Sequence, residues 1–359
     1  MTGRNARAAA SGRVCRRLAA SVACIGSMTA CSRGTSPATI GPDARAPAGP
    51  IAAAPSATAA IEPAEGATPM DARGASEATS IATMKLLDPG QPPRRKLRYL
   101  WNASQKEELA VELRTSASTE AGDGKQPEIL LPPVHIDIAI DPESVSPDGD
   151  LHYDWTVRDA TMTSDVLVPS QIADGMRAEV SAIDHLRGTA TVTSRGISKA
   201  IWLDPSTVAE AGATGQMIEQ VRQTLRDVAA PLPDEDVGRG ARWQKHSLLD
   251  AKQTRITQTE TFTLLEIAGN KASLEDVLAQ TAPAQALSAP GMPHRSQARM
   301  ESMLASGNAK IRINLSQLVP QTKFDGTTTM VVSEQSTSDT TRRLTMIMRI
   351  AIAIEGTTR

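Results

Sequence analysis

The chain has 359 residues, 38 basic and 40 acidic side chains, and only eight aromatic residues. Five of the arginines lie before residue 18, so the remainder carries 33 basic side chains against 40 acidic ones. This acidic balance argues against nucleic-acid binding and against electrostatic docking on anionic lipid. All three cysteines fall within the first 31 residues, which excludes a disulfide framework, a cysteine metal site and a thiol nucleophile from the rest of the chain.

Residues 1–30 have the plan of a secretory signal peptide. A segment rich in arginine and free of acids precedes the uncharged stretch 18–30, "LAASVACIGSMTA". A basic segment followed by 7–15 apolar residues is typical of an export signal, and it is too short to span a bilayer as a helix. We therefore expect an exported protein.

Cys31 is the expected lipid-attachment residue. The stretch Met28-Thr29-Ala30-Cys31 resembles the lipobox of bacterial lipoproteins, although Met28 replaces the usual leucine. The resemblance implies a diacylglyceryl and acyl lipid on the Cys31 thiol, which becomes the first residue of the mature chain; Cys24 is the alternative. Ser32 resembles the residue found in lipoproteins sent to the outer membrane, so we expect anchoring there.

Residues 31–84 are expected to form a disordered linker. Of the 53 residues after Cys31, 39 are Ala, Pro, Ser, Thr or Gly, and none is aromatic. Such a stretch buries too little apolar area to offset its conformational entropy. The expected linker holds the rest of the protein away from the membrane.

Residues 85–359 are predicted to form a mainly β (α+β) body of antiparallel, curved sheets. "VHIDIAID" (134–141) and "LHYDWTVR" (151–158) alternate apolar and polar residues, and turn residues separate them, which predicts a hairpin. "TMIMRIAIAIE" (345–355) alternates in the same way. Further strands are predicted at 96–102, 109–115, 177–183, 189–195, 241–249, 256–267, 272–280, 309–315 and 327–334.

One long central helix is predicted over 207–229, where apolar residues recur at helical spacing before Pro231. The body is then one large domain, or two intimate lobes (85–205 and 237–359) joined by this helix. After the helix, Gly238 and Gly240 form a Gly-x-Gly motif. They open a strand instead of a helix, so we interpret them as a tight turn leading Trp243 into the core and not as a phosphate site.

Several short motifs resemble those of a family of uncharacterised bacterial lipoproteins. They are Leu97-Arg98-Tyr99, Pro231-Leu232-Pro233, Val237-Gly238, Gly240-Ala241, Trp243 and Thr261-Phe262-Thr263-Leu264. The resemblance implies a lipid-anchored signal, a small-residue linker and a β-rich body. It implies no activity and no catalytic residue.

No pattern of catalytic or metal-ligating residues stands out. The acidic stretches 141–150 and 234–236 lack the spacing of an EF-hand calcium loop. The five histidines show no metal-ligand spacing, although His135 and His152 lie on the polar faces of the predicted hairpin. We therefore expect no metal, no cofactor beyond the lipid on Cys31, and no enzymatic activity.

Three functions remain open. The first is a non-enzymatic module that binds a partner protein of the cell envelope through solvated strand faces. The second is a carrier of an apolar or lipid ligand in a concave sheet, suggested by methionine-rich strands such as 346–350; a sheet curved around a helix is similar to the half-barrels of lipid-chaperone lipoproteins. The third is a hydrolase with an unrecognised site.

Overall fold

The computed structural model describes residues 82–122, 124–163, 168–207, 215–251, 254–287, 297–335 and 341–359. All of them belong to one compact unit. The signal segment, Cys31 and the expected linker up to residue 81 lie outside the described residues. No helix within the described ranges is long and apolar enough to cross a membrane.

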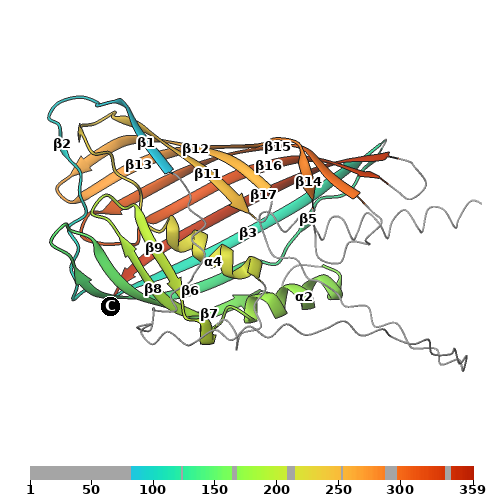
Figure 1. The fold of residues 1–359 in the computed structure, drawn as a ribbon, viewed down its shortest axis with the longest axis horizontal. Coiled ribbons are helices and arrows are strands. Elements are labelled where there is room, and N and C mark those ends of the chain that lie inside the picture. The colour runs from blue at the N-terminus through green and yellow to red at the C-terminus, as the bar shows by residue number, and fades with distance from the viewer. Residues whose placement is uncertain are drawn as a thin grey trace, which may run out of the picture. The chain divides into compact units, whose positions relative to one another are not determined.

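One large antiparallel sheet dominates this unit (Figure 1). Its strands up to residue 203 are β1 (Ala82–Asp88), β3 (Glu107–Ala121), β4 (Gly124–Lys125), β5 (Ile129–Leu130), β6 (Val134–Val145), β7 (Leu151–Met162), β8 (Arg187–Val192) and β9 (Ser198–Leu203). Those after residue 241 are β11 (Arg242–Ala251), β12 (Thr254–Ala268), β13 (Lys271–Ala282), β14 (Gln285–Leu287), β15 (Gln297–Asn314), β16 (Gln321–Gln335) and β17 (Thr341–Thr358). Two short strands, β2 (Arg95–Lys96) and β10 (Asp236–Val237), pair separately.

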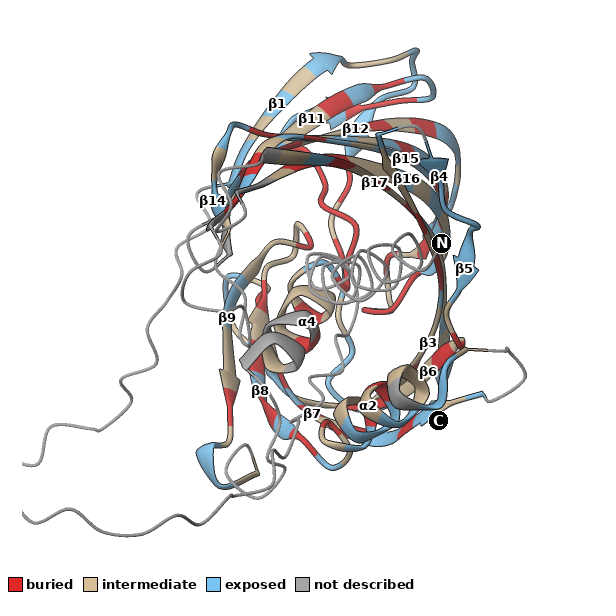
Figure 2. Cartoon of the chain, turned by 90° about the vertical axis from the view of Figure 1, so that its right-hand side faces the viewer, coloured by how far each residue is buried: buried red, intermediate tan, exposed pale blue. Residues whose placement is uncertain are grey.

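The sheet order is β1-β11-β12-β13-β15-β16-β17-β3-β6-β7-β8-β9, and the sheet is curved, as the end-on view in Figure 2 shows. This confirms the predicted fold class. Earlier and later strands meet at two places in this sheet, since β1 pairs with β11 and β3 pairs with β17. The predicted hairpin 134–158 is confirmed as β6 and β7, whose inward residues Leu151, Tyr153, Trp155 and Val157 are all buried.

Two helices lie inside the curve of the sheet (Figure 2). Helix α2 (Ser170–Ser181) packs on β7, and helix α4 (Gly215–Arg226) packs near β9. The prediction of a strand at 177–183 was wrong, since most of that segment is the end of α2. Ile172, Met176 and Val180 recur every four residues and turn one helical face to the core. The predicted strand 177–183 contains only the last of these three residues, so the helical period is not visible within it.

Helix α4 is shorter than the predicted helix 207–229, part of which (208–214) lies outside the described residues. Its residues Val221 and Leu225 are buried as the helical spacing predicts. The chain leaves the helix after Arg226, and 228–232 continue into the core as an irregular, fully buried segment. The two prolines at 231 and 233 deny this segment a helical hydrogen-bond pattern.

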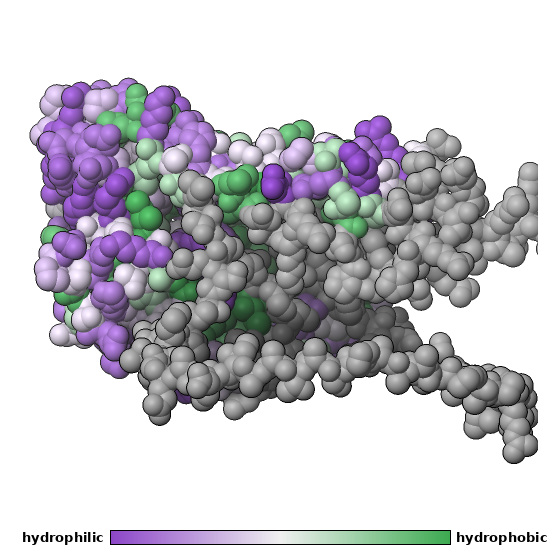
Figure 3. Space-filling view, in the orientation of Figure 1, coloured by the Kyte–Doolittle hydropathy of each residue, from purple (hydrophilic) through white to green (hydrophobic). Residues whose placement is uncertain are grey.

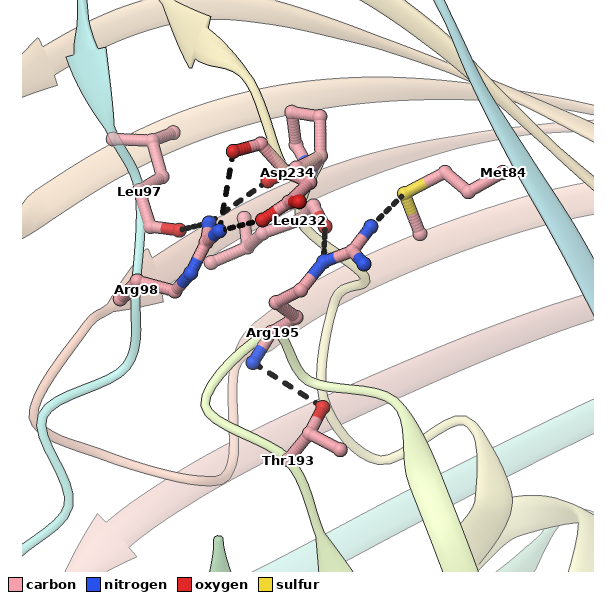
Figure 4. A network of polar contacts seen from close by, with 8 residues as sticks. Met84, Leu97, Arg98, Thr193, Arg195, Leu232 and Asp234 are labelled. Atoms are coloured by element: carbon pink, nitrogen blue, oxygen red, sulfur yellow. Dashed lines mark hydrogen bonds and ion pairs between the residues drawn. The ribbon is translucent and has the colours of Figure 1, made fainter. Parts of the chain in front are cut away.

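Two arginines from neighbouring loops hold this buried segment in place (Figure 4). The guanidinium of Arg98 donates to the carbonyl of Pro233 at 2.9 Å and pairs with the Asp234 carboxylate. The Nε of Arg195 donates to the carbonyl of Leu232 at 3.0 Å. These bonds satisfy buried carbonyls that no strand or helix pairs, which a buried loop requires.

The predicted strand at 96–102 is also wrong, because most of this segment is irregular. Only Arg95 and Lys96 form a ladder; after them Leu97 and Tyr99 are buried in an irregular segment, while Leu100 is 62% exposed. Tyr99 and Leu100 donate their backbone N–H groups to Ser194 and Leu315, which belong to two different loops. The Tyr99 ring stacks on Trp101 at 4.4 Å between centroids, so the apolar residues here fill one end of the curved sheet.

The Gly238–Gly240 turn brings the chain from the region after the buried segment 228–232 into β11. A Cβ on Gly238 would lie 1.8 Å from the carbonyl oxygen of Gln91, and Gly240 has φ of +80°. Trp243 follows and is fully buried, its indole N–H donating to the Pro231 carbonyl at 3.0 Å. The two glycines therefore serve close backbone packing and a left-handed turn.

Candidate functional site: the concave face of the sheet

Strand alternation and helix contacts together identify the side chains on the concave face. Lys245 on β11 forms an ion pair with Asp227, which directly follows α4, so Lys245 points to the side that holds the helices. Cross-strand partners share a face in an antiparallel sheet. The register from β11 to β17 then places Glu260, Leu278, Gly307, Gly326 and Ile350 on that same face.

The middle of the concave face is apolar and half-buried. Six large side chains from β3, β16 and β17 line it in direct register: Val111, Leu113, Phe324, Ile350, Ile352 and Ile354. Figure 3 shows hydrophilic residues gathered at the end of the molecule that carries β2, with hydrophobic residues visible further along. A contiguous, partly exposed apolar surface on a concave sheet is a typical ligand-binding surface.

A second apolar cluster lies farther along the same face, at the β14 end of the sheet. It contains four buried methionines, Met300, Met303, Met330 and Met346, packed with Ile256, Ala282, Ala298 and Val332. The described helices make their main contacts elsewhere, α2 with β7 and α4 with β9. Methionine is flexible and polarisable, and it adapts to apolar partners of different shape.

A polar belt separates this methionine cluster from the main core. We define it as Asp227, Lys245, Ser247, Gln258, Glu260, Asp276 and Gln280, from the α4 end, β11, β12 and β13. Lys245 is its centre: the Nζ atom lies 2.8 Å from Asp227 Oδ1 and 3.0 Å from Glu260 Oε2. The Gln280 amide donates to the Gln258 carbonyl oxygen at 2.6 Å.

The charges in the belt do not balance, because one lysine faces three carboxyl groups. Burial alone would lower the pKa of Lys245, but the carboxylates of Asp227 and Glu260 more than offset this and raise it. Burial raises the pKa of Glu260 despite the neighbouring lysine. At neutral pH the lysine is therefore charged while the belt holds at least one carboxyl group that resists ionisation.

Asp276 is that carboxyl group. The residue is only 5% exposed, and its Oδ1 atom has no hydrogen-bond partner among the described residues. Burial, then the negative charges of Glu260 and Asp227, raise the pKa of Asp276 to about 8. It lies in one cross-strand row with Phe262 and Ala309, at the border between the main core and the belt. A buried, unpaired acceptor of this kind is costly, and such groups concentrate at functional sites.

The convex face carries a hollow of about 490 Å³ over the middle strands. Its rim includes Arg114 and Arg349, which are exposed, together with Leu130 at 59% exposure. The Arg349 guanidinium donates to Glu128 Oε1, which also accepts from the Ser116 hydroxyl. These two hydrogen bonds, that from Ser116 first, lower the pKa of Glu128, so the carboxylate stays charged there.

The histidine and acidic side chains that the sequence analysis considered as metal ligands do not come together in the structure. His135 lies opposite Thr161 and His152 opposite Ser144, so the hairpin does not bring the two histidines together. In the acidic stretches, Asp150 pairs with Lys199 and Asp234 with Arg98. No group of three or more metal-ligating side chains occurs within the described ranges. Cys31 lies outside those ranges, and Gly238, Gly240 and Trp243 have the packing roles given above.

Sequence reasoning missed the polar belt. Its members come from four elements between residues 227 and 280, and no short motif contains them. One signal was available: Lys245, Glu260 and Asp276 occupy apolar positions in otherwise alternating strands, where a charged residue breaks the pattern. Comparison of the chain with protein-family models, with curated proteins and with solved structures gives no match.

Proposed function

We propose that the protein is a carrier that binds one long-chain apolar ligand along the concave face of its sheet. The observation that carries this proposal is the continuous apolar lining from Val111 and Ile354 to Phe324. The side chains of this lining are only half-buried. The methionine cluster extends the apolar lining toward the β14 end. The polar belt supplies hydrogen-bonding groups beside it for the polar end of an amphiphile.

We further propose that the carrier is exported and held at a bacterial cell membrane, at the outer membrane in particular, by a lipid on Cys31. The sequence of residues 1–31 supports this part. Anchoring near a membrane gives an apolar ligand a short path between bilayer and protein, since free transfer through water costs about 0.8 kcal/mol for each exposed CH₂ group.

Probe displacement by the purified full chain tests the proposed carrier function. The fluorescent apolar probe N-phenyl-1-naphthylamine should bind with increased emission, and decanol should displace it. The variant Thr328→Trp should reduce probe affinity about tenfold or more, because a bulky side chain would fill the concave face between Phe324 and Met330. Ile352→Glu should have a similar effect by placing a charge in the apolar lining.

The matched control is Leu304→Glu, which adds the same charge at a side chain 62% exposed on the opposite face of the sheet. It should leave probe binding unchanged. Circular dichroism of all three variants checks that the sheet is intact. Equal probe binding by wild type, Thr328→Trp and Ile352→Glu would contradict the carrier function.

A partner-binding module is the second candidate, and the convex hollow between Arg114 and Arg349 is the observation that favours it. Its rim combines two cations with the exposed Leu130, a composition suited to a protein surface. The concave lining and the methionine cluster involve residues of more strands than this hollow does, so we prefer the carrier function.

A further inference from the structure

We propose that the polar belt selects a cationic amphiphile: the ligand's ammonium group binds at Asp276 beside Glu260, and its alkyl chain lies along the apolar concave face. This inference rests on the proposed carrier function and names the ligand class of the same site. It depends on the charge count of the belt, on the unpaired oxygen of Asp276 and on the position of Asp276 next to the apolar lining.

The charged side chains of the belt favour a ligand head group with a positive charge. Lys245 is already engaged by Asp227 and Glu260 at 2.8 and 3.0 Å, so it has little capacity for a further anion. A carboxylate or phosphate head group would add negative charge beside the largely buried Glu260 and Asp276 and the more exposed Asp227, which together face one base. An ammonium group instead supplies the missing positive charge, and buried charges are tolerated where they are paired.

The unpaired oxygen sets the hydrogen-bonding character. Asp276 Oδ1 is buried without a donor among the described residues, whereas Glu260 Oε2 already faces the Lys245 ammonium at 3.0 Å. An ammonium group of the ligand has three N–H donors and no acceptor, so it can donate to Asp276 Oδ1 without leaving an acceptor of its own unpaired.

The location sets the shape of the ligand. Asp276 shares a cross-strand row with Ala309 and Phe324, and the next residue of the apolar lining along that row is Ile352. A head group at Asp276 would therefore place the first part of an alkyl chain on Phe324 and Ile352. The groups facing Asp276 are Glu260 on β12, Lys245 on β11 and Asp227 after α4, while β15 contributes only Ala309 in this row.

Binding should be linked to protonation. The protonated Asp276 must lose its proton to pair with an ammonium group, and that proton passes to the buffer. Affinity for decylamine, which stays cationic throughout, should therefore rise from pH 6 to pH 8 by about three- to tenfold per unit. Below pH 8 calorimetry in buffers of different ionisation enthalpy should show close to one proton released per ligand.

The test compares decylamine, decanol and decanoate on the full chain by calorimetry at pH 7 and pH 8. Decylamine should bind at least tenfold more tightly than either competitor. Asp276→Asn should remove the pH dependence and most of the preference for the amine, while retaining decanol binding. Asp325→Asn, a matched change at an exposed position on the opposite face, should behave as wild type.

The outcomes separate the two proposals. If decanol and decanoate bind as well as decylamine, or if decylamine affinity does not change with pH, the choice of a cationic ligand is wrong and the carrier function stands. If none of the three compounds binds and the probe is not displaced, both the carrier function and the choice of a cationic ligand are wrong.

Discussion

Replacing Lys245 with methionine should lower the free energy of unfolding by about 3–5 kcal/mol at pH 7, the largest effect we expect of any single change in the belt. The side chain is 16% exposed and is the sole base in the belt, within 3.0 Å of two carboxylates. Its removal leaves Asp227, Glu260 and Asp276 together with no positive charge among them. Because methionine retains most of the side-chain volume, the decrease in unfolding free energy measures the lost charge more than lost packing.

Urea denaturation followed by tryptophan fluorescence measures this effect. Lys323→Met, the same substitution at an exposed position on the convex face, serves as the control and should change stability by less than about 0.5 kcal/mol. Combining Lys245→Met with Glu260→Gln should recover part of the loss, because the two changes act on one interaction. A Lys245→Met variant as stable as the Lys323→Met control would show that the belt is not a coupled charge cluster.

Replacing Asp276 with asparagine should stabilise the protein at high pH. The pKa of Asp276 is about 8 in the folded chain against 3.8 for an ordinary aspartate, so the folded state holds the proton more tightly. Wild-type stability therefore decreases as pH rises between these two values, by up to about 1.4 kcal/mol per unit, and this contribution is constant above pH 8. Asparagine has no charge to bury, so we expect a gain on the order of 2–5 kcal/mol at pH 9 and a smaller one at pH 5.

The measurement is the difference in unfolding free energy between wild type and Asp276→Asn at pH 5 and pH 9. Titrating groups outside the belt contribute equally to both proteins and cancel in the difference. Asp325→Asn should show no such pH-dependent gain. A difference that is the same at both pH values would mean that Asp276 ionises normally. A gain in stability together with a loss of amine binding is the behaviour expected of a residue kept for function.

The alternating strands could be predicted from the sequence because each exposes one face to a core and one to water. This is clearest for 134–158 and 345–355, where every second residue is apolar. The same reasoning failed at 177–183 and 96–102. In α2 the apolar residues repeat every four positions, whereas Leu97 and Tyr99 are buried within an irregular segment that forms no strand ladder.

The site was harder to predict than the fold. The concave lining follows from strand alternation, but which strands become neighbours depends on long-range pairing, such as β17 with β3, that no local pattern encodes. Lys245, Glu260 and Asp276 are separated by 15 or more residues along the chain, and only the strand register brings them together. Their signal in the sequence is a charge at a position where alternation calls for an apolar residue.

Native mass spectrometry of the full chain extracted from its own cells tests the carrier function most directly. We predict a noncovalent adduct with the mass of an amphiphile in the native spectrum. A denaturing spectrum of the same sample should lack this adduct but keep any lipid that is covalently bound. The Thr328→Trp variant should carry much less of it. Native and denaturing spectra that give the same mass would contradict the carrier function.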